Sequence, residues 1–419
     1  MIKRVNPGNY LGVIVIPASK SDGQRALLAA ALAKGNSKIS QLGSSKDELN
    51  MLCCIEKLGA KTGMLDGVLD VQGIASFPSE LSLHCGESGL ALRLLTALCA
   101  IHSGRYILNG EGSLLNRSMD FYHTLFLRQK LHYSFSQNNT LPIMLEGRLS
   151  GGKISVDGSQ SSQYISGLLM ALPLLAEDSI LEVTNAVSTP YIKMTLNTLG
   201  VFGIEIQQDE NKYLIRGNQS YQPVKYEVEG DWSSASYWLV ASALGQSVSV
   251  KGLSMDSLQA DKAILNAFEL ANCKVLDTLN GIRIDGSQRH SFHFDASDCP
   301  DLFPALVTLA SLTPGISIIS GVIRLKNKES DRGKVLQSEF GKLGVQILII
   351  GNDMQIHGKA FVSGGKVSAQ HDHRIAMCFG ILGMNTLAGI EIDEAEAVAK
   401  SYPSFWEDLE RCKQVQTKN

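Results

Sequence analysis

The sequence has no excess of basic residues, no cysteine pair at metal-binding spacing and no apolar stretch of membrane-spanning length. It has 38 Lys and Arg residues and 41 Asp and Glu residues, which gives a formal net charge of −3. This balance argues against a general surface for nucleic-acid binding. The eight cysteines are scattered without a CxxC pair, which favours a reducing compartment over a disulfide framework or a zinc site. Because the N-terminal segment has no apolar signal region either, we expect a cytoplasmic enzyme that binds neither nucleic acid nor membrane.

The first informative stretch is KSDGQRALLAAALA, residues 20–33, which follows the strand-like residues 13–16 and Pro17. Its polar opening, with Lys20 and Arg25, runs directly into a segment of Ala and Leu, which are strong helix formers. The pattern predicts a buried helix whose first turn binds an anion, because free backbone N–H groups and the helix dipole favour negative charge there. The alternative is an ordinary capped helix with solvated charges.

This pattern of a polar opening and a charge-poor apolar run returns five more times, at intervals of about 70 residues. The later runs begin near Glu87, Gln160, Asp231, Pro300 and Asp372. Each repeat is predicted to hold one buried helix, a second and more charged helix, and several short strands. A chain of 419 residues is too long for one ordinary core, and six repeats divide naturally as three plus three.

We therefore predict an α/β protein of two lobes, one formed by residues 17–228 and the other by residues 1–16 with 229–419. No low-complexity linker separates them, and two short crossings make a hinge plausible. Residues 1–16 are predicted to form a strand. The outer, more charged helices are predicted at 47–58, 121–128, 192–200 and 260–270, in a segment ending at 343, and at 399–412.

Seven segments, in order along the chain, resemble the EPSP synthase family, the 3-phosphoshikimate 1-carboxyvinyltransferases. They are KSDGQRALLAAAL, SSQYISGLLMALPL, VSTPYIKMT, GDWSSASYWL, KNKESDR, HDHRIAMCF and AKSYPSFWEDL, and they extend from residue 20 to about residue 410. Each segment alone is a weak signal, whereas the ordered set is strong.

The resemblance implies the two-lobed enolpyruvyltransferase fold, in which each lobe has three βαβαββ repeats with buried helices, an inside-out α/β barrel. The helix N-termini would converge on a cleft between the lobes that holds the active site. The implied reaction joins phosphoenolpyruvate to the 5-hydroxyl of shikimate 3-phosphate, giving 5-enolpyruvylshikimate 3-phosphate and phosphate. The family uses no metal and no organic cofactor, and we expect a monomer.

By similarity, the site residues divide between the two phosphorylated carboxylates. Phosphoenolpyruvate would be held by Lys20, Gly89, Arg117, Gln163, Arg332, Arg374 and Lys400. Shikimate 3-phosphate would be held by Ser21, Arg25, Ser161, Ser162, Ser188, Tyr191, Asp301 and Lys328. Guanidinium groups match carboxylate and phosphate oxygens, and hydroxyls donate and accept without adding charge. For Ser161 and Ser162 a simple helix cap is the alternative.

The chemistry is an addition followed by an elimination through a tetrahedral intermediate. Asp301 is the candidate base for the ring hydroxyl, and Glu329 is the candidate acid for the methylene carbon of phosphoenolpyruvate, with Lys20 assisting. An acid that is protonated near neutral pH needs surroundings that raise its pKa, which a closed cleft supplies by desolvation. The alternatives are an N-cap for Asp301 and a surface ion pair with Lys328 or Arg332 for Glu329.

Two local features complicate the resemblance. The segment His371-Asp372-His373 suggests a metal site, but no third ligand cluster supports one. At the second buried helix the family usually has Asn-Ala-Gly-Thr-Ala, a hydrophobic residue and Arg, whereas this chain has Glu87 and Leu90 in place of Asn and Thr. The extra carboxylate could weaken phosphoenolpyruvate binding or pair with a cation, and it predicts an altered sensitivity to glyphosate, the family's inhibitor.

Two other functions stay open from the sequence. UDP-N-acetylglucosamine enolpyruvyltransferase shares the fold and the chemistry, but it is expected to have Lys-Asn after the first strand and a reactive Cys on a mobile loop. This chain has Lys20-Ser21, and its loop GEGSLLNRSMD, which carries Arg117, has no Cys. The other alternative is a catalytically silent relative that binds a phosphorylated metabolite. Intact Lys20, Asp301 and Glu329 argue against it.

Overall fold

The computed structural model describes residues 1–326 and 328–413, and it divides into two compact units. The N-terminal unit is Ala18–Glu229, and the C-terminal unit is Met1–Pro17 together with the chain from Gly230 onward. These boundaries lie one residue from those expected from the sequence. Asn327, within the KNKESDR segment, and residues 414–419 lie outside the described residues.

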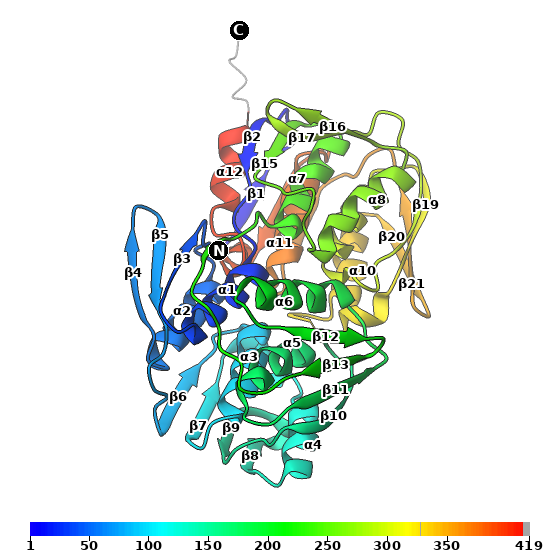
Figure 1. The fold of residues 1–419 in the computed structure, drawn as a ribbon. Helices are drawn as coiled ribbons and strands as arrows, with labels where there is room; N and C mark the ends of the chain where they lie inside the picture. The colour runs from blue at the N-terminus through cyan, green and yellow to red at the C-terminus, as the bar shows by residue number, and fades with distance from the viewer. Residues whose placement is uncertain (327, 414–419) are drawn as a thin grey trace. The chain divides into compact units, whose positions relative to one another are not determined.

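The N-terminal unit contains three four-stranded sheets of one design (Figure 1). In each sheet two parallel strands are joined to an antiparallel hairpin, which is the arrangement that a βαβαββ repeat produces. The first sheet has the order β14 (Lys225–Glu227), β3 (Asn36–Ser40), β5 (Val68–Gln72), β4 (Lys61–Leu65). The second has β6 (Glu80–His84), β7 (Arg105–Asn109), β9 (Thr140–Glu146), β8 (His132–Ser136). The third has β10 (Gly152–Asp157), β11 (Ser179–Thr184), β13 (Lys212–Ile215), β12 (Ile206–Asp209).

Six helices accompany these sheets. The inner three are α1 (Lys20–Leu32), α3 (Gly89–Ala100) and α5 (Ser162–Ala171), and the outer three are α2 (Lys46–Lys57), α4 (Asp120–Gln129) and α6 (Thr189–Val201). Every residue of α3 is buried, as expected for a helix that is apolar all round. Because α3 packs against α5 and both belong to one apolar cluster, the inner helices form the centre of the hydrophobic core of this unit.

The C-terminal unit repeats the design with two four-stranded sheets and one of three strands. The four-stranded sheets have the orders β16 (Lys274–Thr278), β17 (Gly281–Asp285), β15 (Ser247–Lys251), β2 (Leu11–Val15), and β18 (His293–Asp295), β19 (Gly315–Ser320), β21 (Asp353–Gly358), β20 (Gln346–Ile350). The third sheet is β1 (Lys3–Val5), β23 (Ile390–Asp393), β22 (Gly365–Ser368). The inner helices are α7 (Trp232–Ala243), α9 (Phe303–Ser311) and α11 (His373–Gly383), all fully buried and in mutual contact. The outer helices are α8 (Ile264–Leu270), α10 (Arg332–Lys342) and α12 (Phe405–Cys412).

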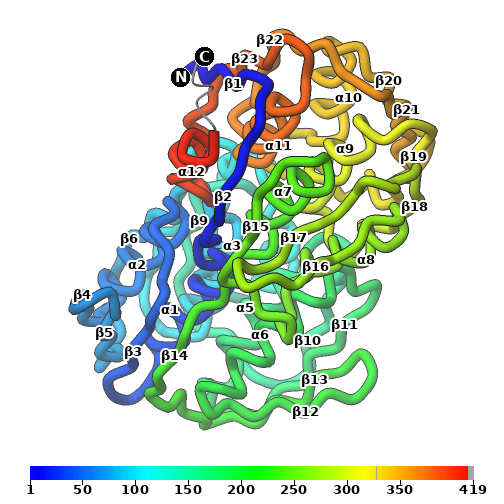
Figure 2. The backbone as a smooth tube through the Cα atoms, turned by 90° about the horizontal axis from the view of Figure 1, so that it is seen from above, coloured from blue at the N-terminus to red at the C-terminus, as the bar shows by residue number. Residues whose placement is uncertain are grey.

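The prediction of one strand over residues 1–16 is wrong, because this segment forms two strands in two different sheets. β1 pairs with β23, whereas β2 lies parallel to β15, as the tube in Figure 2 shows. Pro7, which lacks a backbone N–H, and Gly8 lie in the break between them. The predicted helix at 399–412 is also interrupted: a 3-10 helix ends at Lys400, Pro403 follows, and α12 begins at Phe405.

None of the helices in the described ranges is both long and apolar enough to cross a membrane.

Candidate active site

Side-chain hydrogen bonds join the N-terminal halves of α1, α3, α5 and α6 within the N-terminal unit. The Ser88 hydroxyl, at the N-cap of α3, donates to Gln24 Oε1 on α1 at 2.7 Å. Arg25 on α1 donates to Thr195 Oγ1 on α6 at 2.8 Å and to Ser166 Oγ on α5 at 3.4 Å. Helix N-termini favour anions, so the fold gathers several such ends in one place.

Arg25, a predicted ligand of shikimate 3-phosphate, is only 1% exposed. Besides its bonds to α5 and α6, its guanidinium donates to the carbonyl oxygens of Ser21 at 2.7 Å and Tyr191 at 3.2 Å. Burial lowers the pKa of Arg25 to about 10. In this structure Arg25 therefore anchors two other predicted ligands. Ser188, a third, has a positive φ of 54° at the start of α6.

Four residues around the first turn of α3 form a group that we call the Gly89 cluster: Gly89, Arg93, Arg117 and Gln163. Arg93 Nη1 donates to Gln163 Oε1 at 2.7 Å and to the Gly89 carbonyl oxygen at 3.2 Å. A methyl group on Gly89 would lie 2.7 Å from Arg93 Nη1 and 2.8 Å from Arg117 Nη1. Two guanidinium groups thus flank a helix N-terminus, which is a suitable arrangement for a carboxylate or a phosphate.

The Gly89 cluster unites three of the predicted phosphoenolpyruvate ligands, and Arg93 is an addition to them. Arg93 is the arginine that ends the family pattern at the second buried helix, and the resemblance did not place it among the ligands. Its spacing of four residues from Gly89 was the available signal, because side chains at i and i+4 lie on one helix face. Its guanidinium also lies over the Tyr164 ring, 5.0 Å from the centroid, which holds the side chain in place.

Lys20 and Ser161 already have partners within the protein. Lys20 Nζ lies 3.0 Å from Asp47 Oδ2, so an arriving anion would compete with Asp47. Ser161 is the N-cap of α5, and its hydroxyl oxygen accepts a hydrogen bond from the Gln163 backbone N–H at 3.2 Å. The capping alternative for Ser161 is therefore observed. A capping hydroxyl keeps its proton and can still donate it to a ligand.

Glu87 and Leu90, the two departures from the family pattern, have different surroundings. The Ser113 hydroxyl donates to Glu87 Oε2 at 3.4 Å, and a methyl group on Gly112 would lie 2.5 Å from the Glu87 carboxyl carbon. Glu87 therefore contacts the 3-10 helix Gly112–Asn116, which directly precedes Arg117. Leu90 is 6% exposed and belongs to the apolar core.

In the C-terminal unit, six charged side chains form a second group, which we call the Asp301 cluster: Asp301, Lys328, Glu329, Arg332, Asp372 and Arg374. Asp301 Oδ1 accepts from Lys328 Nζ at 3.2 Å and from Arg332 Nη1 at 2.7 Å, and Oδ2 accepts from Arg374 Nη2 at 2.9 Å. Burial raises the pKa of Asp301, but the three cations outweigh it and hold the pKa well below its usual range. Asp301 is therefore an ionised carboxylate, and it does not cap α9, whose N-cap is Leu302.

Arg332 is the centre of this cluster and is fully buried. In addition to Asp301, it donates to Glu329 Oε2 at 2.6 Å and to both oxygens of Asp372 at 2.7 and 3.2 Å. These carboxylates raise the pKa of Arg332 despite its burial. Asp372 also accepts from the Arg374 backbone N–H at 3.0 Å as the N-cap of α11. Arg332 therefore joins the starts of α10 and α11.

Glu329 forms the predicted ion pair with Arg332, but this pair does not lie on the surface. The Glu329 side chain is 12% exposed, and its Oε1 lies 3.7 Å from Lys400 Nζ. Lys400 is 7% exposed, and burial lowers the pKa of Lys328. The structure thus brings together all the predicted site residues of the C-terminal unit.

The segment His371-Asp372-His373 is occupied by protein contacts. Asp372 is bound to Arg332, and His371 Nε2 lies 3.0 Å from Glu394. Within residues 1–326 and 328–413, no three His, Cys, Asp or Glu side chains are placed to hold a metal ion.

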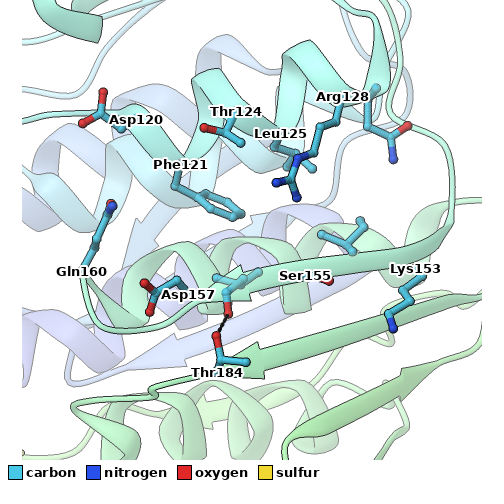
Figure 3. Close-up of a pocket in the computed structure, with 13 residues that line it drawn as sticks. Asp120, Phe121, Thr124, Leu125, Arg128, Lys153, Ser155, Asp157, Gln160 and Thr184 are labelled. Atoms are coloured by element: carbon cyan, nitrogen blue, oxygen red, sulfur yellow. Dashed lines mark hydrogen bonds between the residues drawn. The ribbon is translucent and has the colours of Figure 1, made fainter.

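A separate cavity of about 420 Å³ lies in the N-terminal unit between α4 and β10 (Figure 3). Phe121, Leu125 and Arg128 of α4 face Lys153 and Asp157 of β10 across it. None of the predicted site residues lines this cavity. Arg128 therefore serves below as a control for the arginines of the site.

The chain is similar to known proteins over nearly its whole length. The family model for EPSP synthase (3-phosphoshikimate 1-carboxyvinyltransferase) matches residues 5–409. The 3-phosphoshikimate 1-carboxyvinyltransferase of Clostridium kluyveri is 36% identical over 97% of this chain and 96% of its own, and that of Clostridium acetobutylicum is 37% identical with the same coverage. An EPSP synthase structure from Acinetobacter baumannii superposes with a TM-score of 0.82 at 23% identity, covering 98% of both chains.

These matches confirm the resemblance drawn from the seven sequence segments and the predicted enolpyruvyltransferase fold. The family model and the structural superposition both extend over nearly the whole chain. The chain belongs to the EPSP synthase (3-phosphoshikimate 1-carboxyvinyltransferase) family.

Proposed function

We propose that this chain transfers the carboxyvinyl group of phosphoenolpyruvate to the 5-hydroxyl of shikimate 3-phosphate. The name of the relatives, 3-phosphoshikimate 1-carboxyvinyltransferase, supports the reaction. The observation that carries the residue assignment is the ionised Asp301 carboxylate held among three cations. The carboxylate is a proton acceptor, and the cations around it can bind an anionic substrate, so both functions are available in one place.

The two clusters suit the two substrates, which are both phosphorylated carboxylates. The Gly89 cluster and Lys20 would bind phosphoenolpyruvate together with Arg332, Arg374 and Lys400. The hydroxyls of Ser21, Ser161, Ser162, Ser188 and Tyr191 would bind shikimate 3-phosphate, with Arg25, Asp301 and Lys328. Guanidinium and ammonium groups provide the charge, and the hydroxyls provide directional contacts.

In the addition step, the ring 5-oxygen forms a bond to C2 of phosphoenolpyruvate while its proton passes to Asp301. The methylene carbon takes a proton from Glu329 and becomes a methyl group. In the elimination step, the methyl group returns a proton to Glu329, the double bond forms again, and the bond between C2 and the phosphate oxygen breaks while Asp301 passes its proton to the departing phosphate. Lys20 would stabilise the negative charge on the departing phosphate.

Anion binding would tune the base. Arg374, Lys328 and Arg332 hold the pKa of Asp301 low, which makes it a weak base. Substrate oxygens that share these arginines would offset part of their charge, and the pKa of Asp301 would then rise. The same competition for Arg332 and Lys400 would release Glu329 from its ion pairs.

Two substitutions test the assigned roles. Asp301→Asn keeps the size of the side chain but cannot accept the proton, so we expect phosphate release to fall at least about 100-fold. Glu329→Gln should abolish the exchange of deuterium from D2O into C3 of phosphoenolpyruvate in the presence of shikimate 3-phosphate. Asp277→Asn, on the exposed strand β16, is the control. Full activity in Asp301→Asn would overturn the assignment of the base.

We also propose that the enzyme acts in the cytoplasm as a monomer. The scattered cysteines support a reducing compartment such as the cytoplasm. Size-exclusion chromatography with light scattering would test the monomer, and a mass of twice 45.3 kDa would contradict it.

A further inference from the structure

Asp261 is a buried carboxylate that the family resemblance did not include among the site residues. It lies in the 3-10 helix Ala260–Ala263 of the C-terminal unit and is 4% exposed. Its Oδ2 accepts a hydrogen bond from the Ser233 hydroxyl on α7. Among the described residues its Oδ1 has no hydrogen-bond partner, although it is buried. Burying a carboxylate oxygen without a hydrogen-bond partner costs free energy, and packing alone does not explain that cost.

Ser233 connects Asp261 to the Asp301 cluster. Arg374 Nη1 donates to Ser233 Oγ at 2.6 Å, and Arg374 Nη2 donates to Asp301 Oδ2 at 2.9 Å. A serine hydroxyl has one proton and two lone pairs. Because its proton points to Asp261, its lone pairs are left to accept from Arg374. An ionised Asp261 thus fixes the direction of the serine hydroxyl, and the hydroxyl fixes one edge of the guanidinium.

We propose that Asp261 is a positioning residue that acts through Ser233: it orients Arg374 toward the reacting groups and sets, by its charge, how strongly Arg374 binds an anionic substrate group. The inference rests on the roles proposed above for Asp301 and Arg374. It adds a residue that touches neither substrate, and it predicts that substrate binding is coupled to the protonation of Asp261.

The charges around Asp261 determine the sign of this linkage. Burial raises the pKa of Asp261 to about 6; Asp301 and Asp231 also raise it, and Arg374 and the Ser233 hydrogen bond lower it. The Cys299 thiol, another titratable neighbour, is neutral because burial raises its pKa. Above about pH 6 the Asp261 charge therefore offsets part of the Arg374 charge. Because an anion bound to Arg374 favours the protonated form of Asp261, phosphoenolpyruvate should bind more tightly when Asp261 carries its proton.

The first experiment compares the wild type with Asp261→Asn from pH 5 to pH 8. The amide oxygen can still accept from Ser233, but the charge is absent. We expect the ratio of the KM for phosphoenolpyruvate in the wild type to that in Asp261→Asn to rise roughly fivefold from pH 5 to pH 7.5. Because the ionisation of phosphoenolpyruvate affects both enzymes equally at a given pH, it cancels in this ratio. A ratio that does not change with pH would overturn the proposed effect of the charge.

The second experiment tests whether Asp261 acts through Ser233. At pH 7.5, Asp261→Ala and Ser233→Ala should each raise the KM for phosphoenolpyruvate about tenfold, because each removes the support of one edge of Arg374. The double variant should raise KM no further than the larger single effect. Asp277→Asn, an exposed carboxylate in the same unit, should match the wild type in both experiments.

The outcomes separate this inference from the proposed function. Additive effects of Asp261→Ala and Ser233→Ala would overturn the link through Ser233 even if Asp301→Asn is inactive. An active Asp301→Asn would instead overturn the assignment of the base. If Asp261→Asn does not fold, as judged by circular dichroism, Ser233→Ala decides the question, and an unchanged KM in that variant overturns the proposal.

Discussion

Replacing Gly89 by alanine should damage phosphoenolpyruvate binding in a way that the structure makes quantitative. The new methyl group would lie 2.7 Å from Arg93 Nη1 and 2.8 Å from Arg117 Nη1, whereas 3.4 Å is an ordinary contact. Both guanidinium groups must therefore retreat by about 0.7 Å. A misplacement of about 1 Å in a binding group costs up to about 100-fold. We expect the KM for phosphoenolpyruvate to rise about 10- to 100-fold in Gly89→Ala.

The assay is steady-state phosphate release with shikimate 3-phosphate held at saturation, so that only phosphoenolpyruvate binding is varied. Gly200→Ala on α6 is the matched control, because a methyl group there would meet no atom within 4 Å. The control should keep its KM and fold as the wild type does. An unchanged KM for phosphoenolpyruvate in a folded Gly89→Ala would refute the placement of the anion between the two arginines.

Three further predictions follow from single residues. Arg117→Ala should raise the KM for phosphoenolpyruvate at least about tenfold, whereas Arg128→Ala, beside the separate cavity, should leave it unchanged; equal effects in steady-state assays would contradict the assignment. Arg332→Met should lower the free energy of unfolding in urea by about 3–5 kcal/mol, because it leaves buried carboxylates unpaired; a loss below about 1 kcal/mol would argue against Arg332 as the centre of the cluster. Burial lowers the pKa of His102 to about 4 in the folded protein, whereas an unfolded histidine has a pKa of about 6.5. As the pH falls from about 6.5 to about 4, the unfolded chain binds this proton before the folded protein does, so the free energy of unfolding decreases over that range. His102→Phe, which can keep the stacking on Phe77, should be less sensitive to acid over this range in urea unfolding, and an unchanged pH dependence would refute the assigned cause.

The architecture could be predicted from the sequence because the inner helices are apolar all round. α3 and α7 are buried along their whole lengths, and such helices have a pattern unlike that of surface helices. The two strands within residues 1–16 were less predictable, because each is defined by pairing with a strand far along the chain: β1 pairs with β23, and β2 pairs with β15. Local propensity contains no information about such partners.

The site was predictable to the extent that family motifs contain it. Asp301, Lys328, Arg332 and Arg374 come from three separate segments, yet the fold gathers them around one carboxylate. The burial of Arg25 was not predictable, because an arginine near the start of a helix is equally compatible with solvent.

Asp261 was missed for the same reason. Its neighbours in sequence give no signal of its chemistry, and its importance depends on a serine 28 residues away.

The most direct test of the account is phosphate release from phosphoenolpyruvate by the purified protein, with shikimate 3-phosphate present, absent, or replaced by UDP-N-acetylglucosamine. We predict release only when shikimate 3-phosphate is present. Release only with the nucleotide sugar would mean that the acceptor is wrong although the fold and the chemistry are right. Release with neither acceptor would contradict the proposed activity.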